Sequence, residues 1–221
     1  MQKIRKATHY LRALYHTRMR ARRFLRTLTI RHLTTPDELD AAFRLRYEIF
    51  CKERNLLPVD RFPDGREQDA HDQYSEQFLA LAGTEPIGTI RLIKHSPLGF
   101  PMVALHPLPR DVVPDRFVEV SRVAVVKSAR SVHGIVLLGL CRAISEWSAT
   151  HGMTDWGARL DERILKRLQF LGIPFSAVYG PFDVPGDPEP LYCAFSDVAR
   201  TQRVLTSRTI KALLGPVRIQ T

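Results

Sequence analysis

The order of strand and helix patterns along the chain restricts its fold more than any other sequence feature. Short apolar, β-branched segments alternate with segments of helical period, and no internal repeat is present. From the N-terminus the pattern is β–α–β–β–β–α–β–α–β–β. This alternation favours a single α/β domain with a mixed central sheet flanked by helices. A chain of 221 residues, 44% of them hydrophobic, can bury one core of that kind.

The boundaries of the expected elements follow from local signals. The first helix has Thr35 as its cap, Pro36 at its first position and Glu38 completing a capping box. Strands are expected at 26–33, 75–83, 86–94, 117–126, 154–160, 174–180 and 191–198, and helices at 35–53, 135–152 and 161–172. The end of the chain, up to Thr221, is identified only as a basic segment.

The positive charge is concentrated at the N-terminus. The formal net charge is +10, and residues 1–31 hold ten Lys or Arg and no acidic residue. Apolar residues recur there at helical spacing from Ile4 to Tyr15. We therefore expect a basic amphipathic arm over residues 1–26 and a domain over residues 27–221. This composition fits an arm that binds an acidic carrier protein or an anionic membrane, and equally a solvated helix on the domain or a mitochondrial transit peptide. The lack of interleaved aromatic residues argues against nucleic acid as the partner.

Composition also bears on the compartment. The N-terminus lacks the apolar centre of a signal peptide, and no run of residues has the length of a membrane span. We expect a cytoplasmic protein, with peripheral contact to the inner membrane through the arm. Cys51, Cys141 and Cys193 are widely spaced, which predicts buried thiols rather than disulfides or a zinc site.

One predicted core strand is unusually polar. The stretch FVEVSRVAVV places Glu119, Ser121 and Arg122 among β-branched residues. Strict alternation would put Glu119 and Arg122 on opposite faces of the sheet. Buried charges are costly unless they are paired or functional, so the alternatives are a structural salt bridge and a site. If the two residues act together, the strand needs a bulge or splay between them.

Other charged residues are expected near this strand. Arg91 ends the sequence GTIR on the preceding strand, and Arg46 lies on the apolar stripe of the first helix, four residues before Phe50. Three carboxylates, Glu67, Asp69 and Asp72, precede the first hairpin strand. Together with Arg122, these arginines and carboxylates would form a polar pocket at one end of the core. The spacing around His71 matches no metal-binding signature, and no GxSxG elbow is present, so we predict neither a metal site nor a nucleophile triad.

The segment KSARSVHG follows the polar strand and leads into an apolar helix. It carries Lys127 and Arg130, and Gly134 is placed at the opening of the helix. The first N–H groups of a helix lack partners and favour anions, so this turn suits a phosphate group.

In order along the chain, the motifs RYEIF, EQDAHD, GTIRL and EVSRVAV resemble those of the acyl-homoserine-lactone synthases and, more closely, their relatives the N-acyl amino acid synthases. Both are GNAT-like acyltransferases, and the resemblance runs from about Arg46 to Phe195. It implies a GNAT-like fold and transfer of a fatty acyl group from the phosphopantetheine of acyl carrier protein to the amino group of an amino acid, without a bound cofactor. Homoserine-lactone synthases carry a tryptophan where this chain has Asn55-Leu56-Leu57, which favours an amino acid over S-adenosylmethionine as the acceptor.

The resemblance and the chemistry of acyl transfer together suggest roles. Glu119 would be the general base, directly or through a water, while backbone N–H groups of a splayed strand would polarise the thioester carbonyl. Arg122 and Arg91 would orient carboxylates, including Glu119 and that of the acceptor. Substrate contacts are expected from Arg46, Phe50, Asp69, Asp72 and Ser121, and phosphopantetheine contacts from Lys127, Arg130 and Gly134.

Three other functions fit the same residues. A homoserine-lactone synthase remains an alternative, and FPDGREQDAHD also resembles the acyltransferases associated with exosortase systems. A third alternative is a GNAT-like module without turnover, which would bind a ligand or regulate a partner at the membrane.

Overall fold

The computed structural model describes residues 26–215 and 217–220, without the side chains of residues 130–133. The predicted arm over residues 1–26 therefore lies outside the described residues, apart from Arg26. The strands are β1 (Leu28–Leu33), β2 (Ser75–Ala82), β3 (Glu85–Ile93), β4 (Phe117–Val125), β5 (Asp155–Asp161), β6 (Ser176–Phe182), β7 (Leu191–Asp197) and β8 (Arg218–Gln220). The α-helices are α3 (Pro36–Arg46), α4 (His133–Thr150), α5 (Glu162–Phe170), α6 (Val198–Leu205) and α7 (Arg208–Leu214).

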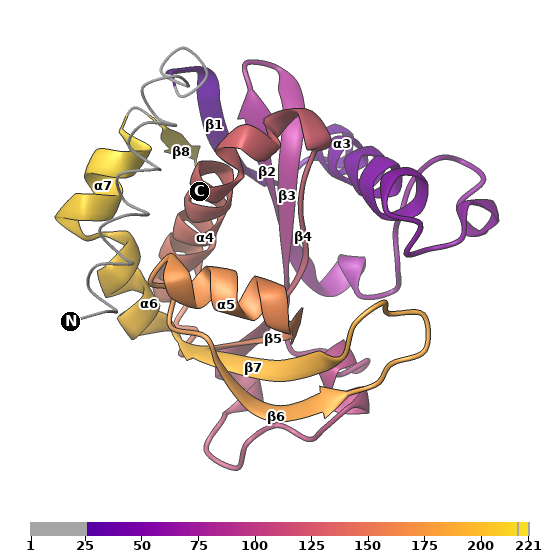
Figure 1. Ribbon diagram of the computed structural model, residues 1–221, viewed down its shortest axis with the longest axis vertical. Helices are drawn as coiled ribbons and strands as arrows, with labels where there is room; N and C mark the ends of the chain where they lie inside the picture. The colour runs from indigo at the N-terminus through magenta and orange to yellow at the C-terminus, as the bar shows by residue number, and fades with distance from the viewer. Residues whose placement is uncertain (1–25, 216, 221) are drawn as a thin grey trace.

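The strands form one mixed sheet in the order β6-β7-β5-β4-β3-β2-β1-β8 (Figure 1). The pairs β4–β5 and β1–β8 are parallel, and the other neighbours are antiparallel. Figure 1 shows α3 and α4 on the two sides of strands β2 to β4. The α/β architecture predicted from the sequence is thus confirmed.

Each face of the sheet has its own core. The larger core lies under α4 to α7 and includes Val118, Leu138 and Trp156, all fully buried. On the other face, α3 packs through residues such as Ala42 and Leu45 against strands β1 and β2. Strand β4 contributes to both, with Val118, Val120 and Val125 in the larger core and Ala124 in the smaller one.

Short helical turns connect the larger elements. A π-helix, η1 (Tyr47–Glu53), continues α3, and 3-10 turns occupy the loops. These turns are η2 (Val59–Arg61), η3 (Asp72–Tyr74), η4 (Pro101–Ala104), η5 (Pro114–Arg116) and η6 (Lys127–Val132). Of these, η4 matters most for the site, because it packs against the polar part of β4.

The seven predicted strands and three predicted helices are present. The capping box also forms: Thr35 Oγ1 accepts a hydrogen bond from the N–H of Glu38, whose carboxylate accepts one from the N–H of Thr35. The C-terminal segment, predicted only to be basic, instead forms α6, α7 and β8. Asp197 and Ser207 cap these two helices, and both signals are present in the sequence.

Further observations concern the cysteines, metal binding and membrane crossing. The three cysteines are buried and free, as expected. In the part of the chain that the structure describes, no group of three or more His, Cys, Asp or Glu side chains could hold a metal ion. None of the described helices is both long enough and apolar enough to cross a membrane.

Candidate active site

Three arginines and three carboxylates form one largely buried network on the α3 face of the sheet. Arg46 Nε donates to Glu67 at 2.6 Å, and its Nη1 donates to Asp72 at 2.7 Å. Arg91 Nη1 donates to both Asp69 and Asp72 at 2.8 Å. The convergence of these residues, predicted from their places in the sequence, is confirmed.

The network holds its carboxylates in the charged form. Burial alone would raise the pKa of Asp72, but hydrogen bonds and charge from Arg46, with charge from Arg91, outweigh it and lower that pKa to about 2. Burial likewise opposes ionisation of Glu67 and Asp69, and their arginine partners still lower both pKa values. The three positive and three negative charges cancel, so the network is electrically neutral and closed.

A β-bulge brings Arg122 into this network. In the pairing of β3 with β4, Thr89 lies opposite Ala124 and Arg91 opposite Ser121, so Ile90 faces two residues of β4. Arg122 is one of them and has a φ of 50°, in the left-handed region that a non-glycine residue rarely adopts. Its guanidinium therefore turns toward the α3 face, where it donates to Glu67 and Asp69, both at 2.9 Å. A bulge or splay was predicted around Glu119 to Arg122, and the bulge at Arg122 confirms it.

Phe50 and Ser121 support the arginines. The ring of Phe50 lies 5.8 Å from the guanidinium carbon of Arg122, at cation–π distance. Ser121 Oγ accepts a hydrogen bond from Arg91 Nε at 2.9 Å. Both residues thus contact the network, while their predicted contacts with substrate stay predictions.

Glu119 lies apart from the network, in a mainly apolar setting under η4. Its side chain is 1% exposed, and its Oε2 accepts a hydrogen bond from the backbone N–H of Met102 at 2.8 Å. Burial raises the pKa of Glu119 to about 7, against the opposing effects of the Met102 N–H and the charge of Arg159. A carboxyl group with this pKa can accept and release a proton near neutral pH.

The contacts correct one part of the predicted mechanism. Arg91 and Arg122 were expected to orient Glu119, but their hydrogen bonds go to Asp69, Asp72, Glu67 and Ser121. Strong buried carboxylate partners occupy these guanidinium groups, so they do not turn toward Glu119. The nearest arginine to Glu119 in the described chain is instead Arg159 of β5, with Nε 3.8 Å from Oε1.

Strands β4 and β5 separate just beyond Glu119. They pair in parallel only from Phe117 to Glu119, whose partner is Gly157, and then diverge. Gly157 is required there because a Cβ atom would lie 2.4 Å from Cζ of Phe117 and 2.6 Å from Sδ of Met102. The remainder of β4 therefore has no strand partner on its β5 side in the described structure, which is the splay expected from the sequence.

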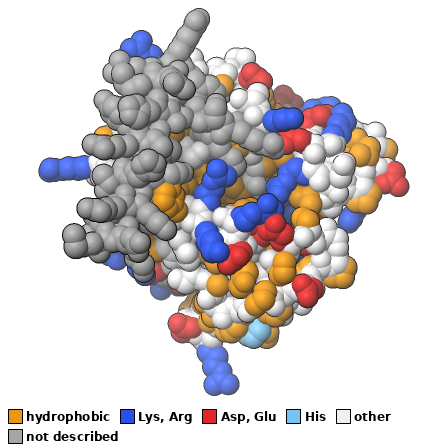
Figure 2. Space-filling view, viewed as in Figure 1, with side chains coloured by type: hydrophobic (Ala, Val, Ile, Leu, Met, Phe, Trp, Pro, Cys, Tyr) orange, Lys and Arg blue, Asp and Glu red, His pale blue; other side chains and the backbone are white. Residues whose placement is uncertain are grey.

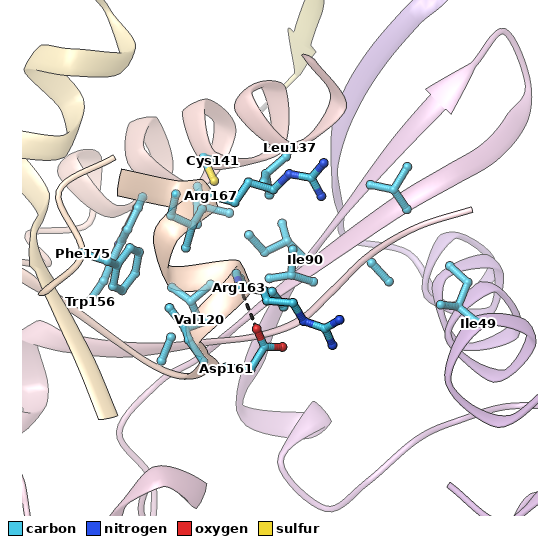
Figure 3. A pocket seen from close by; sticks show the side chains of 18 of the residues that line it. Ile49, Ile90, Val120, Leu137, Cys141, Trp156, Asp161, Arg163, Arg167 and Phe175 are labelled. Carbon is cyan, nitrogen blue, oxygen red and sulfur yellow. Dashed lines mark hydrogen bonds between the residues drawn. The ribbon is translucent and has the colours of Figure 1, made fainter. Parts of the chain in front are cut away.

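A cavity of about 500 Å³ fills the gap between the two strands. Figure 3 shows Trp156 and Phe175 side by side at one end, Ile49 at the other, and Val120 and Ile90 between them. Most of the wall is apolar, and it includes Leu137 and Cys141 of α4. The cavity therefore suits an extended apolar group that passes along the edge of β4.

Arginines mark the polar side of this cavity. Arg54, Arg163 and Arg167 line it and are exposed to solvent. Figure 2 shows several Lys or Arg side chains near the centre of the same face, with Asp or Glu side chains among them and apolar side chains nearby. This combination suits a ligand with an apolar part and an anionic part.

The binding of phosphopantetheine by Lys127, Arg130 and Gly134 stays a prediction. Lys127 is exposed at the start of η6, and α4 begins at His133, so Gly134 is its second residue. The side chain of Arg130 lies outside the described residues. Neither Lys127 nor Gly134 is among the described residues that line the cavity, whose charged lining residues are Arg54, Asp161, Arg163 and Arg167.

Sequence reasoning missed several residues of the site. Trp156, Leu168 and Phe175 line the cavity but have the sequence pattern of ordinary core residues. Arg163 and Arg167 are four residues apart on one face of a predicted helix, a spacing that could have pointed to a basic rim.

Comparison with known proteins identifies a matching domain family and a homologue. The model of the acetyltransferase (GNAT) domain matches residues 45–139. Isovaleryl-homoserine lactone synthase of Bradyrhizobium diazoefficiens is 34% identical over 149 residues, which cover 64% of this chain and 65% of that relative. The chain thus aligns with just under two thirds of the length of this curated relative.

Solved structures share the fold. A CoA-dependent acyl-homoserine lactone synthase, BjaI, solved with SAM and isopentyl-CoA, has a TM-score of 0.68 at 26% identity and covers 87% of this chain and 92% of its own. FeeM, an N-acyl amino acid synthase from uncultured soil microbes, has a TM-score of 0.59 at 14% identity over 78% of this chain and 91% of its own. The chain therefore carries a GNAT domain, adopts the GNAT-like α/β fold, and has an acyl-homoserine lactone synthase as a homologue.

Proposed function

We propose that this protein is an N-acyltransferase that moves an acyl group from a phosphopantetheine thioester to the α-amino group of an amino acid. The observation that carries the proposal is the separation of β4 from β5 at Glu119, with an apolar cavity in the resulting gap. Glu119, a proton acceptor with a pKa of about 7, does not line the cavity but stands at the last paired position of β4 and β5, one residue before Val120, which does. The homologue and the BjaI structure support acyl transfer as the reaction class.

The reaction needs few groups from the protein. Glu119 removes a proton from the acceptor's ammonium group, directly or through one water, and the free amine attacks the thioester carbonyl. The C–N bond forms, the C–S bond breaks, and the thiol leaves with a proton. Unpaired N–H groups on the free edge of β4 would stabilise the negative oxygen of the tetrahedral intermediate.

The network of Arg46, Arg91 and Arg122 would act as a support rather than as a substrate site. Its charges cancel and its members bond to one another, so it fixes the bulge at Arg122. The bulge in turn sets the course of β4 past Glu119. Asp69 and Arg122, which are partly exposed, would be the members closest to substrate.

The donor would enter through the arginine-lined side of the cavity. Arg54, Arg163 and Arg167 would attract the phosphate of phosphopantetheine, which acyl carrier protein and coenzyme A have in common. We favour acyl carrier protein, because an acidic partner also suits the basic arm over residues 1–26. Lys127 would add to the attraction from the turn before α4.

A homoserine-lactone synthase is the second candidate, supported by the 34% identical relative. The product separates the candidates. Purified full-length protein is incubated with acyl carrier protein or coenzyme A carrying a fatty or branched acyl chain, and with either the proteinogenic amino acids or S-adenosylmethionine. Mass spectrometry should find an N-acyl amino acid, and the Glu119→Gln variant should give little of it. An acyl-homoserine lactone as the main product would favour the second candidate, and thioester binding without any product would indicate a module without turnover.

A further inference from the structure

Arg159 lies beside Glu119 without belonging to the buried network. It stands on β5 two residues after Gly157, the partner of Glu119 in the sheet, so alternation puts it on the same face. The Nε atom of Arg159 is 3.8 Å from Oε1 of Glu119, too far for a hydrogen bond but close enough for charge attraction. The side chain of Arg159 is 32% exposed, so solvent reaches it.

The donors of Arg159 are available, in contrast to those of the neighbouring arginines. Arg46 and Arg91 are buried and bonded to carboxylates, and Arg122 is paired with two. Arg159 makes no hydrogen bond with any residue that the structure describes. A carboxylate entering near Glu119 would therefore find unpaired guanidinium N–H groups at Arg159, whereas the neutral network offers it little net attraction.

The pair of Arg159 and Glu119 is complementary to one kind of ligand. A free α-amino acid carries an ammonium group and a carboxylate on the same carbon. Its ammonium group can face the Glu119 carboxylate while its own carboxylate faces the Arg159 guanidinium, so each charge meets its opposite. The short separation of the two protein groups suits two ligand charges that are also one carbon apart.

We propose that Arg159 binds the α-carboxylate of the acceptor and thereby selects α-amino acids over amines that lack this group. The proposal rests on the proposed function and adds the residue that determines acceptor class. It applies to an amino acid and to S-adenosylmethionine alike, because both present an α-amino and an α-carboxylate group. It also replaces the expectation that Arg91 and Arg122 orient the acceptor's carboxylate.

The variants are Arg159→Gln, which removes the charge, and Arg159→Lys, which keeps it. Arg203→Gln is the matched control, because Arg203 is exposed on α6, outside the site. The binding probes are each proteinogenic L-amino acid and S-adenosylmethionine, titrated into full-length protein by calorimetry. The best-bound probe is then compared with its carboxamide, in which the carboxylate charge is gone but the amino group remains.

We expect Arg159→Gln to raise Kd and KM for the acid about 10- to 100-fold, as for the loss of hydrogen bonds to a charged group. Because the charge of Arg159 also lowers the pKa of Glu119, rates are compared at a pH well above 7. There the carboxamide should bind and react equally with wild type and variant, and kcat for the acid at saturation should change little. Arg159→Lys should recover part of the affinity, and Arg203→Gln should match the wild type.

The outcomes separate this proposal from the proposed function. If Arg159→Gln turns over and still prefers the acid to the carboxamide by the wild-type ratio, the role of Arg159 is wrong. The proposed acyltransferase activity is then unaffected. Equal losses for acid and carboxamide, with a shifted pH profile, would overturn it too, because Arg159 would then act only on Glu119. Binding that depends on Arg159 without any turnover would support this proposal and contradict the proposed function. No binding and no turnover would contradict both.

Discussion

Replacement of Glu119 by Gln should stabilise the folded protein at neutral and alkaline pH while it removes the proposed base. The side chain of Glu119 is 1% exposed, and its main compensation for burial is a single backbone N–H from Met102. The oxygen of Gln can still accept that hydrogen bond, and Gln has no charge to bury. The substitution therefore isolates the cost of the buried charge.

The magnitude follows from the pKa. The pKa of Glu119 is about 7 in the folded protein and 4.5 in the unfolded chain. Between pH 4.5 and pH 7 the folded protein therefore binds more protons at this group than the unfolded chain does. Stability contributed by the protonated group is complete below pH 4.5 and is lost as the pH rises toward 7. At about 1.4 kcal/mol per pH unit, the full loss is about 3 kcal/mol above pH 7.

The assay is urea unfolding of wild type and Glu119→Gln from pH 4.5 to pH 8. The difference in free energy of unfolding should move in favour of the variant by about 3 kcal/mol across this range. Glu85→Gln, which changes an exposed carboxylate at the start of β3, should show little pH-dependent difference. A constant difference between Glu119→Gln and wild type over the whole range would refute the reasoning, because Glu119 would then ionise in the folded protein as easily as in water.

Three other changes test separate parts of the structure. Asp72→Asn should cost about 3 to 5 kcal/mol at pH 7, because the network keeps its three arginines but loses the carboxylate that Arg46 and Arg91 share. Because the pKa of Asp72 is lowered to about 2, this difference from wild type should shrink as the pH falls from 4 toward 2, and urea unfolding that shows no such trend would argue against the network. Ala158→Phe adds a ring to the cavity wall and should shift the preferred donor to shorter acyl chains, measured as kcat/KM across a chain-length series; an unchanged preference would place the acyl chain elsewhere. Deletion of residues 1–26 removes nine positive charges, so carrier-protein or liposome binding should become weaker and less salt-dependent while turnover at saturating donor persists. If binding by the full-length and shortened proteins depends equally on salt, the arm does not attract these partners. If the shortened chain fails to fold, the arm is part of the core.

The polar residues of the site could be predicted because each stands out against an apolar pattern. Arg46 interrupts the apolar stripe of a helix, and Arg91 ends a buried strand. Charges in such places need partners, and the run from Glu67 to Asp72 was the nearest source of carboxylates. The bulge followed from the same reasoning, since alternation alone could not bring Arg122 to the face of Glu119.

The identity of the partners could not be predicted in the same way. Four arginines surround the site, and the sequence does not tell which carboxylate each one contacts. Arg91 and Arg122 contact Asp69 because of the register of β3 on β4, the bulge and the loop before β2. Arg159 faces Glu119 instead. In the sequence, Arg159 has the pattern of an ordinary solvent-facing residue of a strand.

The cavity could not be predicted from the sequence, for a different reason. Its walls come from Trp156, Leu168 and Phe175, which have the pattern of residues that fill a core. Whether such residues meet or leave a space depends on how far β5 diverges from β4. That divergence depends on tertiary packing around Gly157, which periodicity does not encode.

The central claim is that Glu119 accepts the proton of the acceptor amine during acyl transfer. Its most direct test is the pH dependence of kcat/KM for the acceptor, measured with wild type and Glu119→Gln at the same donor concentration. We expect the wild-type rate to rise with pH through an apparent pKa near 7, and the variant to be slower by at least about two orders of magnitude and to lack this step. Near-normal turnover by a folded Glu119→Gln variant, with the same step near pH 7, would contradict the account.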